Sequence, residues 1–117
     1  MKILLVEDHA DLADMSCRVL REVYGHEVQL AATGAKALEA ANDDVPDLVL
    51  LDINLPDMSG LEVARELRSD PGFDRTSLVA VTGFGSFIDG DGAQKIGFDG
   101  LFRKPMDFEL LEQLKRG

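Results

Sequence analysis

Short apolar runs alternate with segments of helical periodicity along the whole chain. The runs at residues 2–6, 48–51 and 78–81 are almost unbroken, as is typical of strands buried on both faces of a parallel sheet. Residues 26–31 alternate between apolar and polar side chains, which predicts an edge strand, and residues 101–103 form a short fifth run. The pattern therefore predicts five strands separated by helices.

The first predicted helix depends on Leu12, Met15, Val19 and Val23, which recur at steps of three or four residues before Gly25 ends the segment. We expect this stripe to face the core. Three further helices are predicted from composition and capping residues. They are residues 35–41 capped by Thr33, residues 59–68 with Ser59 and Glu62 spaced as a capping box, and residues 108–115.

The segment 83–97 contains Gly85, Gly90 and Gly92. Because each glycine within a helix costs about 1 kcal/mol relative to alanine, we expect a short or frayed fourth helix that begins near Ala93. Strands that alternate with helices imply a parallel sheet with right-handed crossovers. We therefore predict one α/β domain over residues 1–117, a three-layer α/β/α sandwich whose five-stranded parallel sheet has the flavodoxin-like order 2-1-3-4-5.

Composition narrows the class of protein. With 45% hydrophobic and 29% charged residues, the chain has the make-up of a folded, soluble domain. It lacks an apolar run near the roughly 20 residues of a membrane span, and its start turns acidic at Glu7, unlike a secretory signal. We therefore expect a cytoplasmic protein without membrane insertion. The formal charge of −10 disfavours direct nucleic acid binding and favours cations and basic partners.

Chemistry-bearing residues follow four of the predicted strands. Strand one ends in Glu7 and Asp8, strand three in Asp52, strand four in Thr82 and strand five in Lys104. In open α/β sheets ligands bind outside the carboxyl ends of the strands. The sequence therefore predicts that carboxylates, a hydroxyl and an ammonium group gather at one edge of the sheet.

Each of these groups suits phosphoryl chemistry. Converging carboxylates stay ionised together only when a cation neutralises them, and Mg²⁺ prefers such oxygen ligands while keeping positions open for phosphate. A carboxylate can also attack phosphorus to form an aspartyl phosphate. A lysine and a threonine can then support the phosphoryl oxygens, where charge builds up.

The motifs Glu7-Asp8, Asp52 within LLDINLPDMSG, Thr82-Gly83, and Lys104-Pro105 within GFDGLFRKP follow one another in this order. In this set and spacing the chain resembles, over essentially its whole length, the receiver domain of two-component response regulators. The resemblance implies a phosphoacceptor module that receives a phosphoryl group from a histidine kinase or a histidine phosphotransfer protein and then acts on a downstream protein or an attached output domain. It implies no enzymatic activity beyond the domain's own phosphorylation and dephosphorylation.

The resemblance also assigns roles by position. Asp52 is the implied phosphoacceptor. A dimer formed through the fourth helix, fifth strand and fifth helix is one arrangement that the resemblance implies. The implied Mg²⁺ ligands are Asp8, Asp52 and the backbone carbonyl of Asn54, with Glu7 acting through water. Lys104 is implied to contact the phosphoryl group, Thr82 to be the switch hydroxyl, the Lys104-Pro105 bond to be cis, and Pro56 and Gly60 to shape the loop after Asp52.

One position departs from the family pattern. Receivers commonly carry Tyr or Phe three residues before the lysine, and here that residue is Leu101, with the aromatic at Phe102. Leu101 has no ring to relay a threonine movement, so output is expected to run through residues 83–97. The resemblance also implies that the residues two after the acceptor and two after the threonine tune hydrolysis. Here these are Asn54 and Phe84, and the apolar Phe84 predicts slow self-dephosphorylation.

Plainer interpretations apply to single residues. An Asp at a strand–helix junction is commonly a helix cap, His9 is expected at a helix start, His26 facing solvent, Cys17 in inert packing, and Phe73 and Phe87 in loop packing. Two competing functions also stay open. One is a degenerate receiver that binds partners without phosphorylation. The other is a flavin- or nucleotide-binding α/β enzyme, against which the absence of GxGxxG and GxxxxGK[ST] motifs argues.

Overall fold

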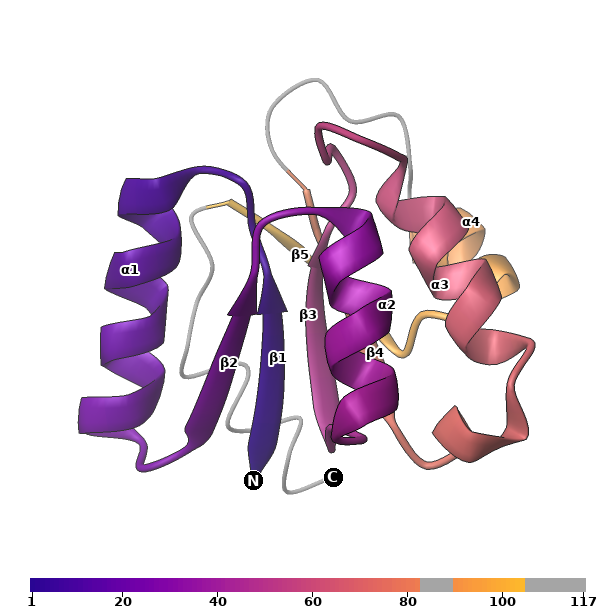
Figure 1. Ribbon diagram of the computed structural model, residues 1–117. Helices are drawn as coiled ribbons and strands as arrows, with labels where there is room; N and C mark the ends of the chain where they lie inside the picture. The colour runs from indigo at the N-terminus through magenta and orange to yellow at the C-terminus, as the bar shows by residue number, and fades with distance from the viewer. Residues whose placement is uncertain (83–89, 105–117) are drawn as a thin grey trace.

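A computed structural model describes residues 1–82 and 90–104 (Figure 1). The helix predicted at 108–115 lies outside the described residues. The same holds for Phe84, Phe87 and the Lys104-Pro105 bond. Within the described part, no helix is long and apolar enough to cross a membrane.

Within residues 1–82 and 90–104, five parallel strands form a single sheet in the order β2-β1-β3-β4-β5. The strands are β1 (Lys2–Val6), β2 (Glu27–Ala31), β3 (Leu48–Asp52), β4 (Ser77–Thr82) and β5 (Gly100–Arg103). The predicted strand order is confirmed. Each predicted strand is present, with bounds that differ by one residue at most at either end.

Helices cover both faces of the sheet, which confirms the three-layer α/β/α architecture (Figure 1). Helix α1 (Ala10–Arg18) lies on one side. Helices α2 (Gly34–Asp43), α3 (Gly60–Arg68) and α4 (Gly90–Ile96) lie on the other. Gly90 is already part of α4, three residues ahead of the start expected near Ala93, and the residues before Gly90 lie outside the described part.

The apolar runs are unbroken because successive strand residues feed opposite cores. In β1, Leu4 and Val6 face the core shared with α2 and α3, while Ile3 and Leu5 face the core shared with α1. Strand β3 is buried along its whole length. Full burial of one such aliphatic side chain contributes about 1.5–3 kcal/mol, so the central strands hold the edge that carries the site rigidly.

The buried face of the first helix differs from the predicted one. Met15 and Val23 are 52% and 68% exposed, whereas the small residues Ala13 and Cys17 are buried against the sheet together with Leu20. Small side chains let a helix approach a sheet closely, so the largest apolar residues were the wrong guide to its inner face. In addition, the helix continues as a π-helical turn, η1 (Val19–Val23), which interrupts the regular period.

His26 was expected to face solvent, and this prediction is wrong, because the residue is only 6% exposed. Gly25 takes a positive φ of 72°, which suits glycine. The chain then turns inward, and the His26 backbone N–H donates to the Leu20 carbonyl. The terminal amino group of Met1 lies 3.2 Å from His26 Nδ1.

Both predicted capping residues, Thr33 and Ser59, do cap their helices. Thr33 Oγ1 accepts from the Lys36 N–H at 3.1 Å, which caps α2 as expected. Ser59 caps α3, but its hydroxyl accepts from Leu61, while the Glu62 N–H donates to the Ser59 carbonyl oxygen. This contact differs from the predicted capping box.

Candidate functional site

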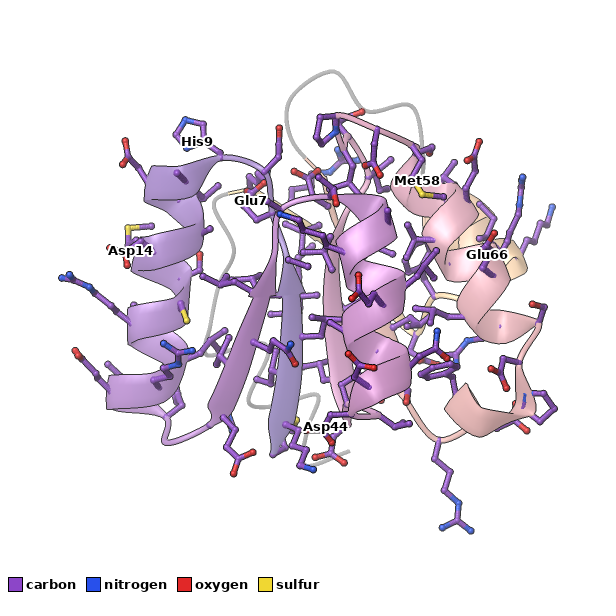
Figure 2. All side chains as sticks on the ribbon, in the orientation of Figure 1. Glu7, His9, Asp14, Asp44, Met58 and Glu66 are labelled. Carbon is purple, nitrogen blue, oxygen red and sulfur yellow. The ribbon has the colours of Figure 1, made fainter. Side chains whose placement is uncertain are left out.

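The strand ends bring together residues that lie far apart in the sequence. Glu7 follows β1, and its backbone N–H donates to the Ala31 carbonyl, so the chain stays tied to β2 beyond the strand itself. Asp52 is the last residue of β3, and Lys104 follows β5. Figure 2 shows Glu7 at the same end of the molecule as His9 and Met58, the end where the strands terminate.

Lys104 bridges two carboxylates. Its Nζ lies 2.7 Å from Glu7 Oε1 and 2.9 Å from Asp52 Oδ2. The side chains of both acids are 5% exposed and that of Lys104 is 25% exposed. Asp8 is exposed beside them, and one oxygen each from Glu7, Asp8 and Asp52 lie within 4.8 Å of one another. The structure therefore brings these four residues together at the predicted edge of the sheet.

Negative charge exceeds positive charge in this cluster. Burial, followed by the neighbouring carboxylate of Asp52, raises the pKa of Glu7, and Lys104 opposes the shift. For Lys104, burial alone favours the neutral amine, but its hydrogen bonds with Glu7 and Asp52 outweigh burial and raise its pKa. Glu7 Oε2 is buried and finds no hydrogen-bond partner among the residues that the structure describes.

These features fit a hard metal cation. A buried carboxylate oxygen without a partner is costly, and a water molecule bound to a divalent ion would supply one. The group Glu7, Asp8 and Asp52 offers only oxygen donors, which suit Mg²⁺ or Ca²⁺ rather than a thiolate- or imidazole-seeking metal. The exposed Asp8 leaves the group open on its solvent side.

The loop between β3 and α3 is closed tightly around Asp52. The Asn54 N–H donates to Asp52 Oδ1 at 3.0 Å, and Asn54 pairs with Ser59 in an antiparallel bridge. The Gly60 N–H donates to the Ile53 carbonyl at 2.8 Å. These bonds hold the loop, and they occupy one of the two Asp52 oxygens from the backbone side.

The remaining predicted residues are placed only in part. Thr82 ends β4 and is aligned with Arg103 of β5, so its backbone lies at the expected edge, while its side chain is outside the described part. Leu101 packs on the core shared with α2 and α3, and Phe102 packs on the opposite core. The ring of Phe102 therefore lies on the opposite side of the sheet from Leu101, the position where the resemblance leads one to expect an aromatic residue.

Two further side chains have simple structural roles, as expected. His9 caps α1, where its Nδ1 accepts from the Leu12 N–H at 3.4 Å. Phe73 is buried in the short 3₁₀ turn η2 (Pro71–Phe73). Sequence reasoning missed Asp57, whose carboxylate reaches the backbone of α2. Only its partners' positions in space reveal this contact, because they lie 22 and 23 residues away in the sequence.

Comparisons with known proteins agree with this geometry. The chain matches the family model of the response regulator receiver domain over residues 3–115. It is 35% identical over 114 residues to the polar-differentiation response regulator DivK of Brucella ovis, an alignment that covers 97% of this chain and 92% of that protein. The solved structure of the chemotaxis protein CheY4 of Vibrio cholerae has a TM-score of 0.86 at 30% identity, covering 98% and 96% of the two chains. A CheY-like receiver domain of Methylobacillus flagellatus has a TM-score of 0.86 at 32% identity, covering 99% and 96%.

Proposed function

Because the chain belongs to the response regulator receiver domain family of two-component signalling, we propose that Asp52 accepts a phosphoryl group from a histidine kinase or a histidine phosphotransfer protein. The observation that carries the proposal is the ammonium of Lys104 lying between the buried carboxylates of Glu7 and Asp52. A structural ion pair would need only one of these acids. Here Glu7 also keeps a buried oxygen without a partner among the described residues.

In the proposed transfer, a carboxylate oxygen of Asp52 attacks the phosphorus of a phosphohistidine. The P–N bond breaks, its electron pair returns to the imidazole, and an aspartyl phosphate forms. Asp52 Oδ1 is held by the Asn54 N–H and Oδ2 by Lys104. As the phosphoryl group arrives, Lys104 exchanges its contact with Asp52 for one with a phosphoryl oxygen, where negative charge accumulates.

The donor set fits Mg²⁺ as the cation of this site. Asp8, Asp52 and the Asn54 backbone carbonyl would hold it, with Glu7 acting through water, and the ion would neutralise charge during transfer. The protein's own residues would still orient the reaction, because Lys104 and the Asn54 N–H fix the acceptor carboxylate.

The proposed role is that of a switch rather than of an enzyme with a separate substrate. Phosphorylation adds charge and acceptor oxygens, which shift an existing conformational equilibrium. Thr82 would respond to the phosphoryl group, and with Leu101 in place of an aromatic the change would pass to a partner through the segment 83–97. A cytoplasmic location and slow self-dephosphorylation complete the proposal.

Intact-mass spectrometry after incubation with acetyl phosphate and Mg²⁺ tests the proposal. Wild-type protein should gain the mass of one phosphoryl group, and Asp52→Asn should gain none, because an amide is a poor nucleophile. Asp43→Asn, an exposed position at the end of α2, is the matched control and should label like the wild type. An unlabelled wild type would instead support the degenerate receiver.

A further inference from the structure

Asp57, in the loop between β3 and α3, caps a helix to which it does not belong. Its Oδ1 accepts from the Gly34 N–H at 2.8 Å and its Oδ2 accepts from the Ala35 N–H at 3.0 Å. Gly34 and Ala35 are the first residues of α2. The helix's own cap, Thr33, serves a different amide, that of Lys36. The carboxylate of Asp57 therefore ties the loop to the start of α2.

The chemistry of this contact favours an ionised carboxylate. Free amides at a helix N-terminus carry partial positive charge, and hydrogen bonds to a charged acceptor are roughly twice as strong as neutral ones. The backbone hydrogen bonds from Gly34 and Ala35 accordingly hold the pKa of Asp57 below its ordinary value. The contact is directional as well, because each carboxylate oxygen has its own amide.

A steric contact joins the same two segments. A Cβ at Gly34 would lie 2.4 Å from Met58 Cγ and 2.6 Å from Met58 Sδ, far inside van der Waals contact. The missing side chain of Gly34 therefore lets Met58 lie against the start of α2. Met58 in turn packs on the core that α2 and α3 share. The loop is fixed to α2 by adjacent polar and apolar contacts.

The far end of this loop is the acceptor site. Asn54 donates to Asp52 Oδ1, and Asn54 pairs with Ser59 across the loop. Asp57 lies between these two paired residues. Its anchor on α2 therefore restricts the same short segment that supplies the Asn54 backbone to the site.

We propose that Asp57 is a positioning residue for the cation site: its anchor on α2 holds the β3–α3 loop, and with it the Asn54 backbone, in the arrangement that binds the divalent ion. This inference depends on the proposed function, because it assigns Asp57 to the affinity of that site. Asp57 itself does not touch the ion or the phosphoryl group. It acts through the loop.

Calorimetric titration of the full chain with Mg²⁺ tests the inference. Asp57→Ala should weaken Mg²⁺ binding by about tenfold, the lower end of the effect of outer-sphere partners. Asp57→Asn keeps one acceptor oxygen and should fall between Asp57→Ala and the wild type. The matched control is Thr33→Ala, which removes the other cap of the same helix but leaves the loop untouched. It should lower the melting temperature while leaving the Mg²⁺ dissociation constant unchanged.

The outcomes separate the two proposals. Equal Mg²⁺ affinity in Asp57→Ala and wild type would overturn the positioning role while leaving the proposed function intact. Equal weakening in Asp57→Ala and Thr33→Ala would also overturn it, because the effect would then be a general consequence of a less stable α2. A wild type that binds no Mg²⁺ would overturn the proposed function itself. Should Asp57→Ala fail to fold, the comparison of Asp57→Asn with Thr33→Ala decides in the same way.

Discussion

At the scale of single residues, the site depends on a glycine, Gly60, whose lack of a side chain lets α3 begin close to Asp52. Gly60 begins α3 directly beside the end of β3. A Cβ there would lie 2.3 Å from the Asp52 carbonyl oxygen and 2.8 Å from Ile53 Cα. Both are backbone atoms of the segment that aims the acceptor, so neither can rotate away. A side chain at residue 60 therefore has to displace Asp52 or α3.

We expect Gly60→Ala to lower the free energy of unfolding by about 1–3 kcal/mol, as overpacking does in rigid surroundings. Urea denaturation measures the change as a lower midpoint at an unchanged slope. Gly72→Ala is the control, because among the described residues its added Cβ would meet the side chain of Asp70, at 3.2 Å, and no backbone atom. Equal midpoints for wild type and Gly60→Ala would contradict the packing argument.

At the scale of elements, the sequence predicts what depends on local pattern. The strands could be predicted because both faces of the sheet are covered by helices, so that the strand residues form nearly unbroken apolar runs. The buried face of α1 could not be predicted from the pattern, because the buried residues Ala13, Ser16 and Cys17 are small or polar while Met15 is exposed. The prediction that His26 faces solvent was wrong for a related reason, because its burial follows from the turn at Gly25 and not from its residue type.

Contacts with backbone atoms are equally hidden from sequence patterns. Arg68, in the last turn of α3, donates from Nε to the Gly97 carbonyl at 2.8 Å and from Nη1 to the Phe73 carbonyl at 2.9 Å. Its Nη2 lies 2.8 Å from Asp99 Oδ2, which also accepts from the Leu78 N–H. This one guanidinium joins the ends of α3 and α4 to the turn before β5.

We expect Arg68→Ala to destabilise the protein by about 2 kcal/mol, because it leaves part-buried carbonyl groups without their donors. Hydrogen exchange should accelerate most at the C-terminal end of α4, residues 94–97. Arg65 is an exposed residue of the same helix, and Arg65→Ala is the control. It should leave the free energy of unfolding within about 0.5 kcal/mol of the wild type and the exchange rates unchanged. Uniform acceleration over the whole sheet in Arg68→Ala would argue against a local role at α4.

At the scale of the whole molecule, the parallel topology assembles the acidic site. Glu7, Asp52 and Lys104 are separated by up to 97 residues, yet they meet because parallel strands end at one edge. This is why the meeting of these three residues could be predicted from the strand ends, whereas the contacts of Asp57 and Arg68 with distant backbone atoms could not. The price of the convergence is a cluster in which Glu7, Asp8 and Asp52 face a single described ammonium, that of Lys104.

A divalent cation should therefore stabilise the folded protein as a whole. A ligand that binds only the folded state adds about 1.4 kcal/mol at ten times its dissociation constant, by mass action, and each kcal/mol raises the melting temperature of a small domain by a few degrees. The melting temperature in millimolar Mg²⁺ should be higher than in NaCl of equal ionic strength. Because the two salts then screen charges to the same extent, a difference reports specific binding of the ion. Asp8→Asn should lose most of this increment while folding normally without the ion, because Asp8 is exposed. Identical melting in the two salts would show that the carboxylates tolerate their proximity with Lys104 alone, and the cation would then have no place in the stability of the fold.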